Sequence, residues 1–294
     1  MAQRATEDDA PPAGGPLKVI YIMGAGRSGS TILGVALGNC DGVFFAGELD
    51  RWLPRGGVPR GEGEQLQELW RRVRQRADVP ESLFATGTPS LERSSALFDV
   101  RKWPRRRRLR ARYRQASERV YRALAETTGA SHIVDSSHYP MRLREMRTLP
   151  GIELYLVYLM RNPRAVVASL GRSDVRERRF GTVAANAYLW LTSLLSVSVF
   201  LGHPYERRLF VRYEDLVSNP DRVLSAILRR AGSSAEVPDL DRLSTNLPFH
   251  GNRLIESDLV RLERVPAGVP GDSRLTTALQ SPWQLLARRL RPAA

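Results

Sequence analysis

The stretch LKVIYIMGAGRSGST, residues 17–31, decides the fold of this chain. Its first half, Leu17 to Met23, is apolar and rich in β-branched residues, as expected for a strand buried in a parallel sheet. Glycines follow at once, and Ser30 to Asn39 then predicts a helix. A strand, a glycine-rich turn and a helix in this order indicate an anion-binding loop, in which backbone N–H groups and the positive helix end converge on the anion.

The loop departs from that of nucleoside triphosphatases at one position. Gly24 to Thr31 has the spacing of a Walker A loop, G-x-x-x-x-G-K-[ST], but Ser30 occupies the lysine position. Arg27 can supply the missing side-chain charge, while Ser28, Ser30 and Thr31 supply hydroxyl donors. Without the lysine, and with no clear acidic strand end for magnesium, triphosphate hydrolysis is a poor explanation.

The rest of the chain alternates strands with helices. Strands are predicted at residues 43–46, 131–134, 152–160 and 208–213, and helices near 118–128 and after the Asn-Pro pairs 162–163 and 219–220. Each asparagine is expected to cap a helix whose first residue is proline, with ends at Gly171 and Gly232. We therefore predict an α/β fold: a three-layer, P-loop-like parallel sheet with helices on both faces and an inserted helical cap at about residues 51–115.

Domain organisation and compartment follow from composition. The polar, Pro/Gly-rich residues 1–16 predict a disordered N-terminal tail, and residues 17–294 a single domain. The tail has no apolar segment of the kind that a secretory signal requires. The single cysteine, Cys40, excludes a disulfide framework and a cysteine-based zinc site. We expect a cytoplasmic protein without a metal.

One apolar stretch approaches membrane-spanning length. Ala184 to Leu201 contains Asn186, Thr192 and three serines, so we predict a buried helix rather than a transmembrane segment. Peripheral contact with a membrane is the alternative.

The net charge of +14 and pI near 10.8 favour anionic partners. Only Lys18 and Lys102 are lysines among the 45 basic residues, so a bias of the genome towards arginine codons accounts for the charge equally well. The run Arg105 to Arg108 is interpreted as a solvated helix face. Few aromatic residues interleave with this run, which argues against a nucleic-acid partner.

Two further stretches give the chain a family resemblance. GAGRSGSTIL, residues 24–33, resembles the 5′-phosphosulfate loop of bacterial, P-loop-type sulfotransferases that use 3′-phosphoadenosine-5′-phosphosulfate (PAPS). LYLVYLMRNPRAVVASLGRS, residues 154–173, resembles their 3′-phosphate-binding segment. VDSSHYPMRL, FVRYEDLVSNP and FHGNR add similarity in the family's order, so the likeness covers about residues 17–50 and 118–255.

The resemblance implies roles for particular residues. The 5′ end of PAPS would be bound by Arg27, Ser28, Gly29, Ser30 and Thr31. The 3′-phosphate would be bound by Arg161 and Ser169, and by Arg253 in a segment that closes over the nucleotide. Arg161 otherwise is a strand-end arginine paired with a surface carboxylate, and Arg253 a solvated loop residue.

Sulfuryl transfer to a hydroxyl needs a base, and two residues compete for the role. Glu48 has a spacing from Arg27 similar to that of the catalytic glutamate of protein-tyrosine sulfotransferases. His138, in SSHYP, resembles the histidine of the K-T-H-x-P segment of cytosolic sulfotransferases, although bacterial relatives often carry lysine there. His138 could therefore donate to the leaving group instead. The role of Glu48 could be limited to orienting an arginine such as Arg51.

The function expected from these observations is transfer of a sulfuryl group from PAPS to a hydroxyl of a small-molecule, lipid or carbohydrate acceptor. A P-loop kinase of a small molecule and a non-catalytic basic anion-binding protein are the alternatives. The acceptor and the oligomeric state stay open.

Overall fold

The computed structural model describes residues 15–80, 83, 89–93, 99–171, 181–262 and 274–290, so nearly all of the predicted tail lies outside the described residues. A five-stranded sheet has the order β2-β3-β1-β4-β5, and all its neighbouring strands are parallel. Its strands are β1 (Leu17–Gly24), β2 (Val43–Gly47), β3 (His132–His138), β4 (Ile152–Met160) and β5 (Arg208–Arg212). The predicted α/β fold with a parallel sheet is confirmed.

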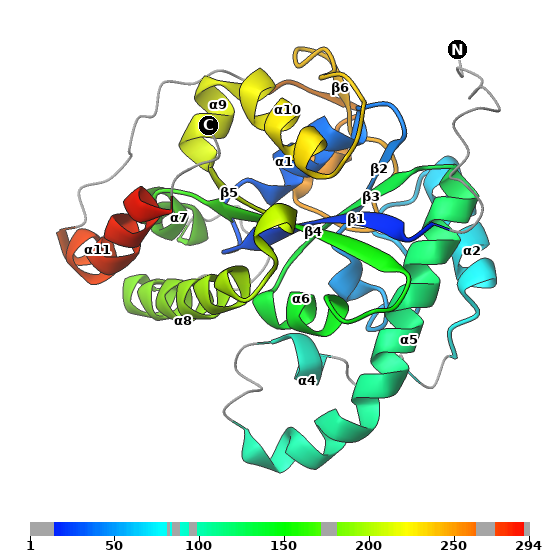
Figure 1. The fold of residues 1–294 in the computed structure, drawn as a ribbon, viewed down its shortest axis with the longest axis horizontal. Coiled ribbons are helices and arrows are strands. Elements are labelled where there is room, and N and C mark those ends of the chain that lie inside the picture. The colour runs from blue at the N-terminus through cyan, green and yellow to red at the C-terminus, as the bar shows by residue number, and fades with distance from the viewer. Residues whose placement is uncertain are drawn as a thin grey trace.

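Helices cover both faces of this sheet (Figure 1). Alternate residues of β1 point to opposite sides: Val19 and Tyr21 join one hydrophobic cluster, and Ile20 and Ile22 join the other. The first cluster is completed by α5 (Trp103–Thr128), α6 (Pro140–Met146) and α8 (Thr182–Leu201), and the second by α1 (Ser30–Gly38), α9 (Tyr213–Ser218) and α10 (Pro220–Arg230). Burial on both sides explains the continuous apolar run of β1.

The remaining described elements complete the fold. They are the helices α2 (Glu64–Ala77), α4 (Pro89–Glu92), α7 (Pro163–Leu170) and α11 (Arg274–Arg289), the 3₁₀ turns η2 (Leu49–Arg51), η4 (Val100–Lys102), η5 (Tyr205–Arg207) and η6 (Arg253–Glu256), and the antiparallel pair β6 (Leu243–Ser244) and β7 (Leu259–Val260).

The helix ends follow most of the predictions. The Asn162 side chain accepts the N–H of Arg164 at 3.0 Å, which confirms the predicted cap of α7. The predicted side-chain cap at Asn219 is wrong, because its backbone N–H closes α9 on Asp215 (2.8 Å) and its side chain caps nothing. Gly171 and Gly232 follow the ends of α7 and α10 as expected, the latter with a φ of 65°.

The segment of residues 51–115 packs into the same core as the sheet. Trp52 and Trp70 both contact Phe249, and their ring centroids lie 5.3 and 4.8 Å, respectively, from the Phe249 centroid. The helix predicted at 118–128 is the second half of α5, which begins at Trp103 and therefore crosses the predicted end of the cap. The segment is thus continuous with the rest of the core.

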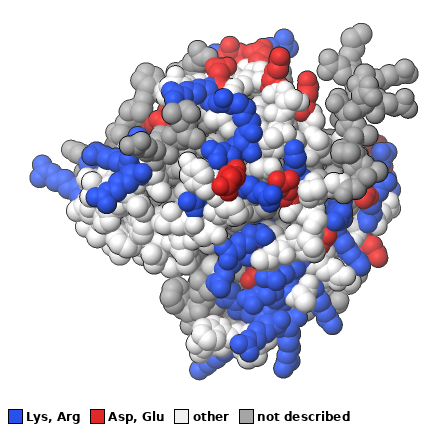
Figure 2. Space-filling view, in the orientation of Figure 1, with Lys and Arg blue, Asp and Glu red and all other residues white. Residues whose placement is uncertain are grey.

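The arginine run lies in the first turns of α5. Arg105, Arg107 and Arg108 are exposed, as predicted for a solvated face, but Arg106 is buried. Figure 2 shows a concentration of positive side chains over this lower end of the molecule.

Two predictions made from apolar patterns require correction. Strand β3 continues beyond residue 134 to His138. The apolar pattern ended too early because Asp135 and Ser136 are polar although they are fully buried. The apolar stretch 184–201 does form a helix, α8, but one side of it is exposed. By length and composition alone α8 could cross a membrane.

Candidate functional site

The glycine-rich loop connects β1 to α1 at the carboxyl edge of the sheet. Arg27 and Gly29 both adopt positive φ values, 70° and 96°, and the Ser28 N–H turns back to the Ala25 carbonyl at 3.3 Å. From α8, the Tyr188 hydroxyl accepts the N–H of Gly26 at 2.9 Å. Consecutive backbone groups are thereby held around the start of α1, as an anion-binding loop requires.

Tyr213 fixes the loop from the side of β5. A Cβ on Gly29 would clash with the Tyr213 ring, so glycine is needed there for close approach as well as for its φ. The same ring packs against the guanidinium of Arg161, with 4.4 Å between the ring centroid and the guanidinium carbon, Cζ. Tyr213 therefore contacts both predicted anion-binding segments, a role that the sequence analysis did not assign to it.

Arg161 connects the two segments directly. It follows β4, and its Nη1 donates to the Arg27 carbonyl at 3.2 Å. The next backbone N–H, of Asn162, donates to the Glu214 carboxylate at 2.8 Å, which holds the start of α7 beside the start of α9. The end of β4 and the glycine-rich loop thus form one site, and Arg161 is not paired with a surface carboxylate by any ion pair among the described residues.

The loop also retains an unused donor. The Nε of Arg27 is buried and has no hydrogen-bond partner within the described residues. A buried guanidinium N–H without a partner costs about 1–3 kcal/mol or more, and an anion at the loop would satisfy it. The residues present therefore fit a bound oxyanion.

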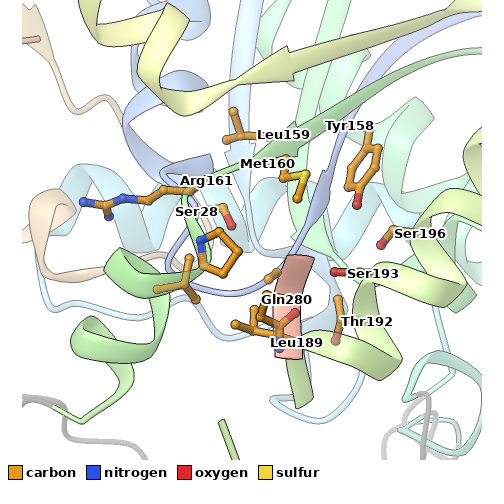
Figure 3. A pocket seen from close by; sticks show the side chains of 13 residues that line it. Ser28, Tyr158, Leu159, Met160, Arg161, Leu189, Thr192, Ser193, Ser196 and Gln280 are labelled. Carbon is orange, nitrogen blue, oxygen red and sulfur yellow. The ribbon is translucent and has the colours of Figure 1, made fainter. Parts of the chain in front are cut away.

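The cavity below the loop is not large enough for a nucleotide. It has a volume of about 20 Å³, roughly that of one water, and Ser28, Ser196 and Gln280 are among its lining residues. Figure 3 shows the Arg161 side chain directed away from Ser193, Ser196 and Gln280. Arg161 is half-buried, so part of its side chain is accessible to solvent.

The other two predicted 3′-phosphate ligands lie on α7 and η6. Ser169 is half-buried in the last turn of α7, and no hydrogen bond joins it to the loop or to Arg161 within the described residues. Arg253 is exposed at the start of η6. Its segment does approach the loop, because a Cβ on Gly251 would lie 3.5 Å from the Thr31 methyl group.

Glu48 lies beyond the end of β2 and faces two histidines. Its Oε2 accepts Nδ1–H of His250 at 3.1 Å. The backbone reinforces this contact, since the Glu48 N–H donates to the His250 carbonyl at 2.8 Å and the Phe249 N–H donates to Ala46 at 2.9 Å. Gly47 permits this approach: its φ is 77°, and a Cβ there would clash with the His250 carbonyl.

The surroundings of Glu48 keep it ionised. Burial acts to raise the pKa of Glu48, but the His250 hydrogen bond and the charges of His138, His250 and Arg51 outweigh burial and lower the pKa to about 2. For His138, burial lowers the pKa below 6.5 and Glu48 opposes the shift. At neutral pH the site therefore holds a carboxylate beside an uncharged His138 imidazole.

His250 is the residue of this cluster that the sequence analysis missed. FHGNR was noted for its arginine, and only the pairing of residue 249 with β2 reveals that the histidine contacts Glu48. Nothing in the sequence connects positions 48 and 250.

A buried ionic network supports the strand end that carries His138. Asp135 accepts both the N–H (2.8 Å) and the hydroxyl of Ser137, and that hydroxyl oxygen in turn accepts the N–H of Asp50 at 2.9 Å. Arg142 lies on the far side of Asp135, at 3.2 Å, and also contacts Glu92 at 3.1 Å. The network positions the chain segments around Glu48 and His138 relative to one another.

A model of the sulfotransferase family matches residues 19–236 of this chain, which includes the loop, Glu48, His138 and Arg161. The chain belongs to the sulfotransferase family. The family implies a sulfuryl donor and an acceptor for this sulfotransferase, and its loop and Arg161 lie where an anionic donor could bind.

Solved structures share the fold of this sulfotransferase. A sulfotransferase domain from the curacin biosynthetic pathway is 20% identical with a TM-score of 0.56, covering 92% of this chain and 97% of that one. A sulfotransferase domain from the olefin synthase of Synechococcus PCC 7002 is 19% identical with a TM-score of 0.56, covering 94% and 97%. Sulfotransferase STF9 from Mycobacterium avium is 13% identical with a TM-score of 0.51, covering 92% and 77%. No curated protein matches the chain.

Within the described part of this sulfotransferase, no group of three or more His, Cys, Asp or Glu residues is arranged to hold a metal ion.

Proposed function

We propose that this sulfotransferase takes the sulfuryl group from PAPS and transfers it to a hydroxyl of a small-molecule, lipid or carbohydrate acceptor. The observation that carries the proposal is the 3.2 Å hydrogen bond from Arg161 to the Arg27 carbonyl. It joins the two segments that resemble the 5′- and 3′-phosphate sites of the family into one site, as a single nucleotide with anionic groups at both ends requires.

PAPS would be held by groups that this chain presents at the loop. The backbone N–H groups of residues 29–31, the hydroxyls of Ser30 and Thr31 and the free Nε of Arg27 would bind the 5′ end, and Arg161 the 3′-phosphate. Ser169 and Arg253 would add to the 3′-phosphate site, as the family resemblance implies. When bound, PAPS supplies an activated sulfur–oxygen bond.

The proton of the acceptor hydroxyl would be taken by the cluster around Glu48. A carboxylate with a pKa of about 2 is a weak base by itself. An uncharged imidazole beside it accepts a proton more readily, and the carboxylate stabilises the imidazolium that forms. We therefore propose His138 or His250 as the base and Glu48 as the group that orients and stabilises it.

Thermal unfolding with nucleotides tests the proposal. Adenosine 3′,5′-bisphosphate should raise the melting temperature more than ATP with magnesium does, because only the former carries a 3′-phosphate for Arg161. Arg27→Ala and Arg161→Ala should each weaken the binding of adenosine 3′,5′-bisphosphate about tenfold or more, the loss expected for a charge-assisted hydrogen bond. Arg222→Ala, an exposed arginine on α10, is the control and should bind normally.

Stabilisation by ATP with magnesium and not by the bisphosphate would reject the proposal in favour of a small-molecule kinase. Binding of polyanions that is steeply salt-dependent and indifferent to Arg27→Ala would favour a non-catalytic basic protein.

A further inference from the structure

A surface helix normally carries polar residues on its exposed side, but the exposed side of α8 is mainly apolar. Its exposed side carries Val183, Ala187, Trp190, Leu194 and Leu201. These positions follow one another at intervals of three, four or seven residues and therefore share one face of the helix. Asn186, Thr192 and Ser196 are instead buried. The exposed side of α8 is thus mainly apolar, with Ser198 between Leu194 and Leu201, whereas its buried side combines these polar residues with apolar ones, among them Leu189, Val199 and Phe200.

Helix α11 also has exposed apolar side chains. Leu275, Leu279 and Leu285 are exposed, by 51%, 41% and 60%, whereas Thr276 and Gln280 are buried. Three of the buried polar residues of the two helices bond to one another. Asn186 donates to the Thr276 hydroxyl at 3.2 Å and accepts from the Gln280 amide at 3.0 Å. A polar seam therefore joins α8 to α11, while Leu194 and Leu201 of α8 and the three leucines named above on α11 stay exposed.

The two apolar faces meet at Trp190. Its ring N–H donates to the Leu279 carbonyl at 2.5 Å, and its ring packs edge-on against Trp283 with centroids 4.8 Å apart. Trp190 and Leu279 each belong to the exposed row of their own helix, so the rows are adjacent. We call the exposed side chains of residues 183, 187, 190, 194 and 201 on α8 and of 275, 279 and 285 on α11 the α8–α11 face.

The charged side chains on these two helices have one sign. Neither α8 nor α11 contains an aspartate or a glutamate, and α11 carries exposed arginines at Arg274, Arg288 and Arg289. In Figure 2 the surface over α8 is white, and positive side chains lie at the end where α11 is found. Side chains of this kind in contiguous exposed patches mark interaction sites.

We propose that the α8–α11 face docks on the surface of an anionic lipid bilayer. Leucines and a tryptophan on one side, arginines beside them and the lack of acidic residues match the chemistry of helices that lie in the plane of a membrane interface. The helix does not span the bilayer, because the opposite side of α8 carries the polar seam and packs on the protein core. The same helix contacts the glycine-rich loop through Tyr188, so docking brings the loop close to the membrane surface.

Flotation of the full chain with lipid vesicles tests this docking. The protein should bind vesicles of mixed phosphatidylcholine and phosphatidylglycerol, and bind vesicles of phosphatidylcholine alone more weakly. Leu194→Gln/Leu201→Gln should lower binding about tenfold, because two half-exposed leucines no longer enter the interface. Arg288→Gln/Arg289→Gln should lower binding to the anionic vesicles by about the same factor.

Leu259→Gln is the matched control, since this leucine is 57% exposed on β7, away from α8 and α11; it should bind as the unmodified protein does. Circular dichroism melts would verify that each variant is folded. Three results would overturn the proposal: no binding to anionic vesicles, equal binding by the leucine variant and the control, or a dimer in sedimentation that Leu194→Gln/Leu201→Gln dissociates, which would assign the face to a second copy.

Discussion

At the scale of single residues, Glu48 has the most constrained environment in the site. It is half-buried, it accepts a hydrogen bond from His250, and its Oε2 lies 3.8 Å from the Arg51 Nε. Glu48 therefore both holds the histidine segment in position and stabilises positive charge near His138. These two roles make different demands on the side chain, because a neutral glutamine keeps its shape but loses the charge.

Glu48→Gln should change both stability and turnover. The folded pKa of Glu48 is about 2, below its ordinary 4.5, so the ionised form stabilises the folded state above pH 4.5 and this contribution is lost as the pH falls toward 2. The unmodified protein should lose more stability between pH 5 and pH 3 than Glu48→Gln does, as measured by urea unfolding. At saturating PAPS and pH 7, Glu48→Gln and His138→Ala should each lower turnover by about tenfold or more.

An equal loss of stability in both proteins between these pH values would contradict the ionised Glu48. If neither substitution lowers turnover, the base lies outside Glu48 and His138, and His250→Asn becomes the decisive variant.

At the scale of elements, the site depends on how β3 ends. Its last residues are polar and buried, and Asp135 connects them to Arg142 on α6, which in turn contacts Glu92 on α4 and the Tyr113 hydroxyl on α5 at 2.7 Å. Arg142 therefore neutralises carboxylates from two elements inside the core. Removing one partner of a buried ion pair leaves an uncompensated charge, and this costs more than the pair itself contributes.

Arg142→Met should lower the free energy of unfolding by about 3–5 kcal/mol, because Asp135 and Glu92 are then buried without their cation. Arg144→Met, on the same helix but exposed, is the control and should change stability by about 0.5 kcal/mol or less. Urea unfolding of the two variants measures the difference. A loss of similar size in both would show that the network is not stabilising.

At the scale of the whole molecule, the segment between β2 and β3 is part of the main core. Trp70 contacts Trp52 and Phe249 at centroid distances of 5.7 and 4.8 Å, and its ring N–H donates to the Leu247 carbonyl at 2.8 Å. Because Phe249 precedes His250, the packing of the segment also fixes a residue of the site.

Trp70→Ala should destabilise the protein by about 3–5 kcal/mol, the cost of emptying a core position of this size. The unmodified protein should nevertheless unfold in one transition, with coincident changes in tryptophan fluorescence and circular dichroism during urea titration, since the segment shares the core. Two separate transitions would indicate that residues 51–115 fold as a unit of their own.

The sequence by itself determined the parallel sheet, the glycine-rich loop after β1 and the place of Arg161 at the end of β4, because each depends on a local pattern: an apolar strand, a glycine spacing or an Asn-Pro helix start. Only the tertiary structure decided the extent of β3, whose buried Asp135 is stabilised by partners from other elements. It alone also brought His250 to Glu48, because a contact between residues 202 positions apart is not encoded in local composition. Nor does local composition decide which side of an apolar helix faces the core, so only the tertiary structure placed Leu194 and Leu201 of α8 at the surface.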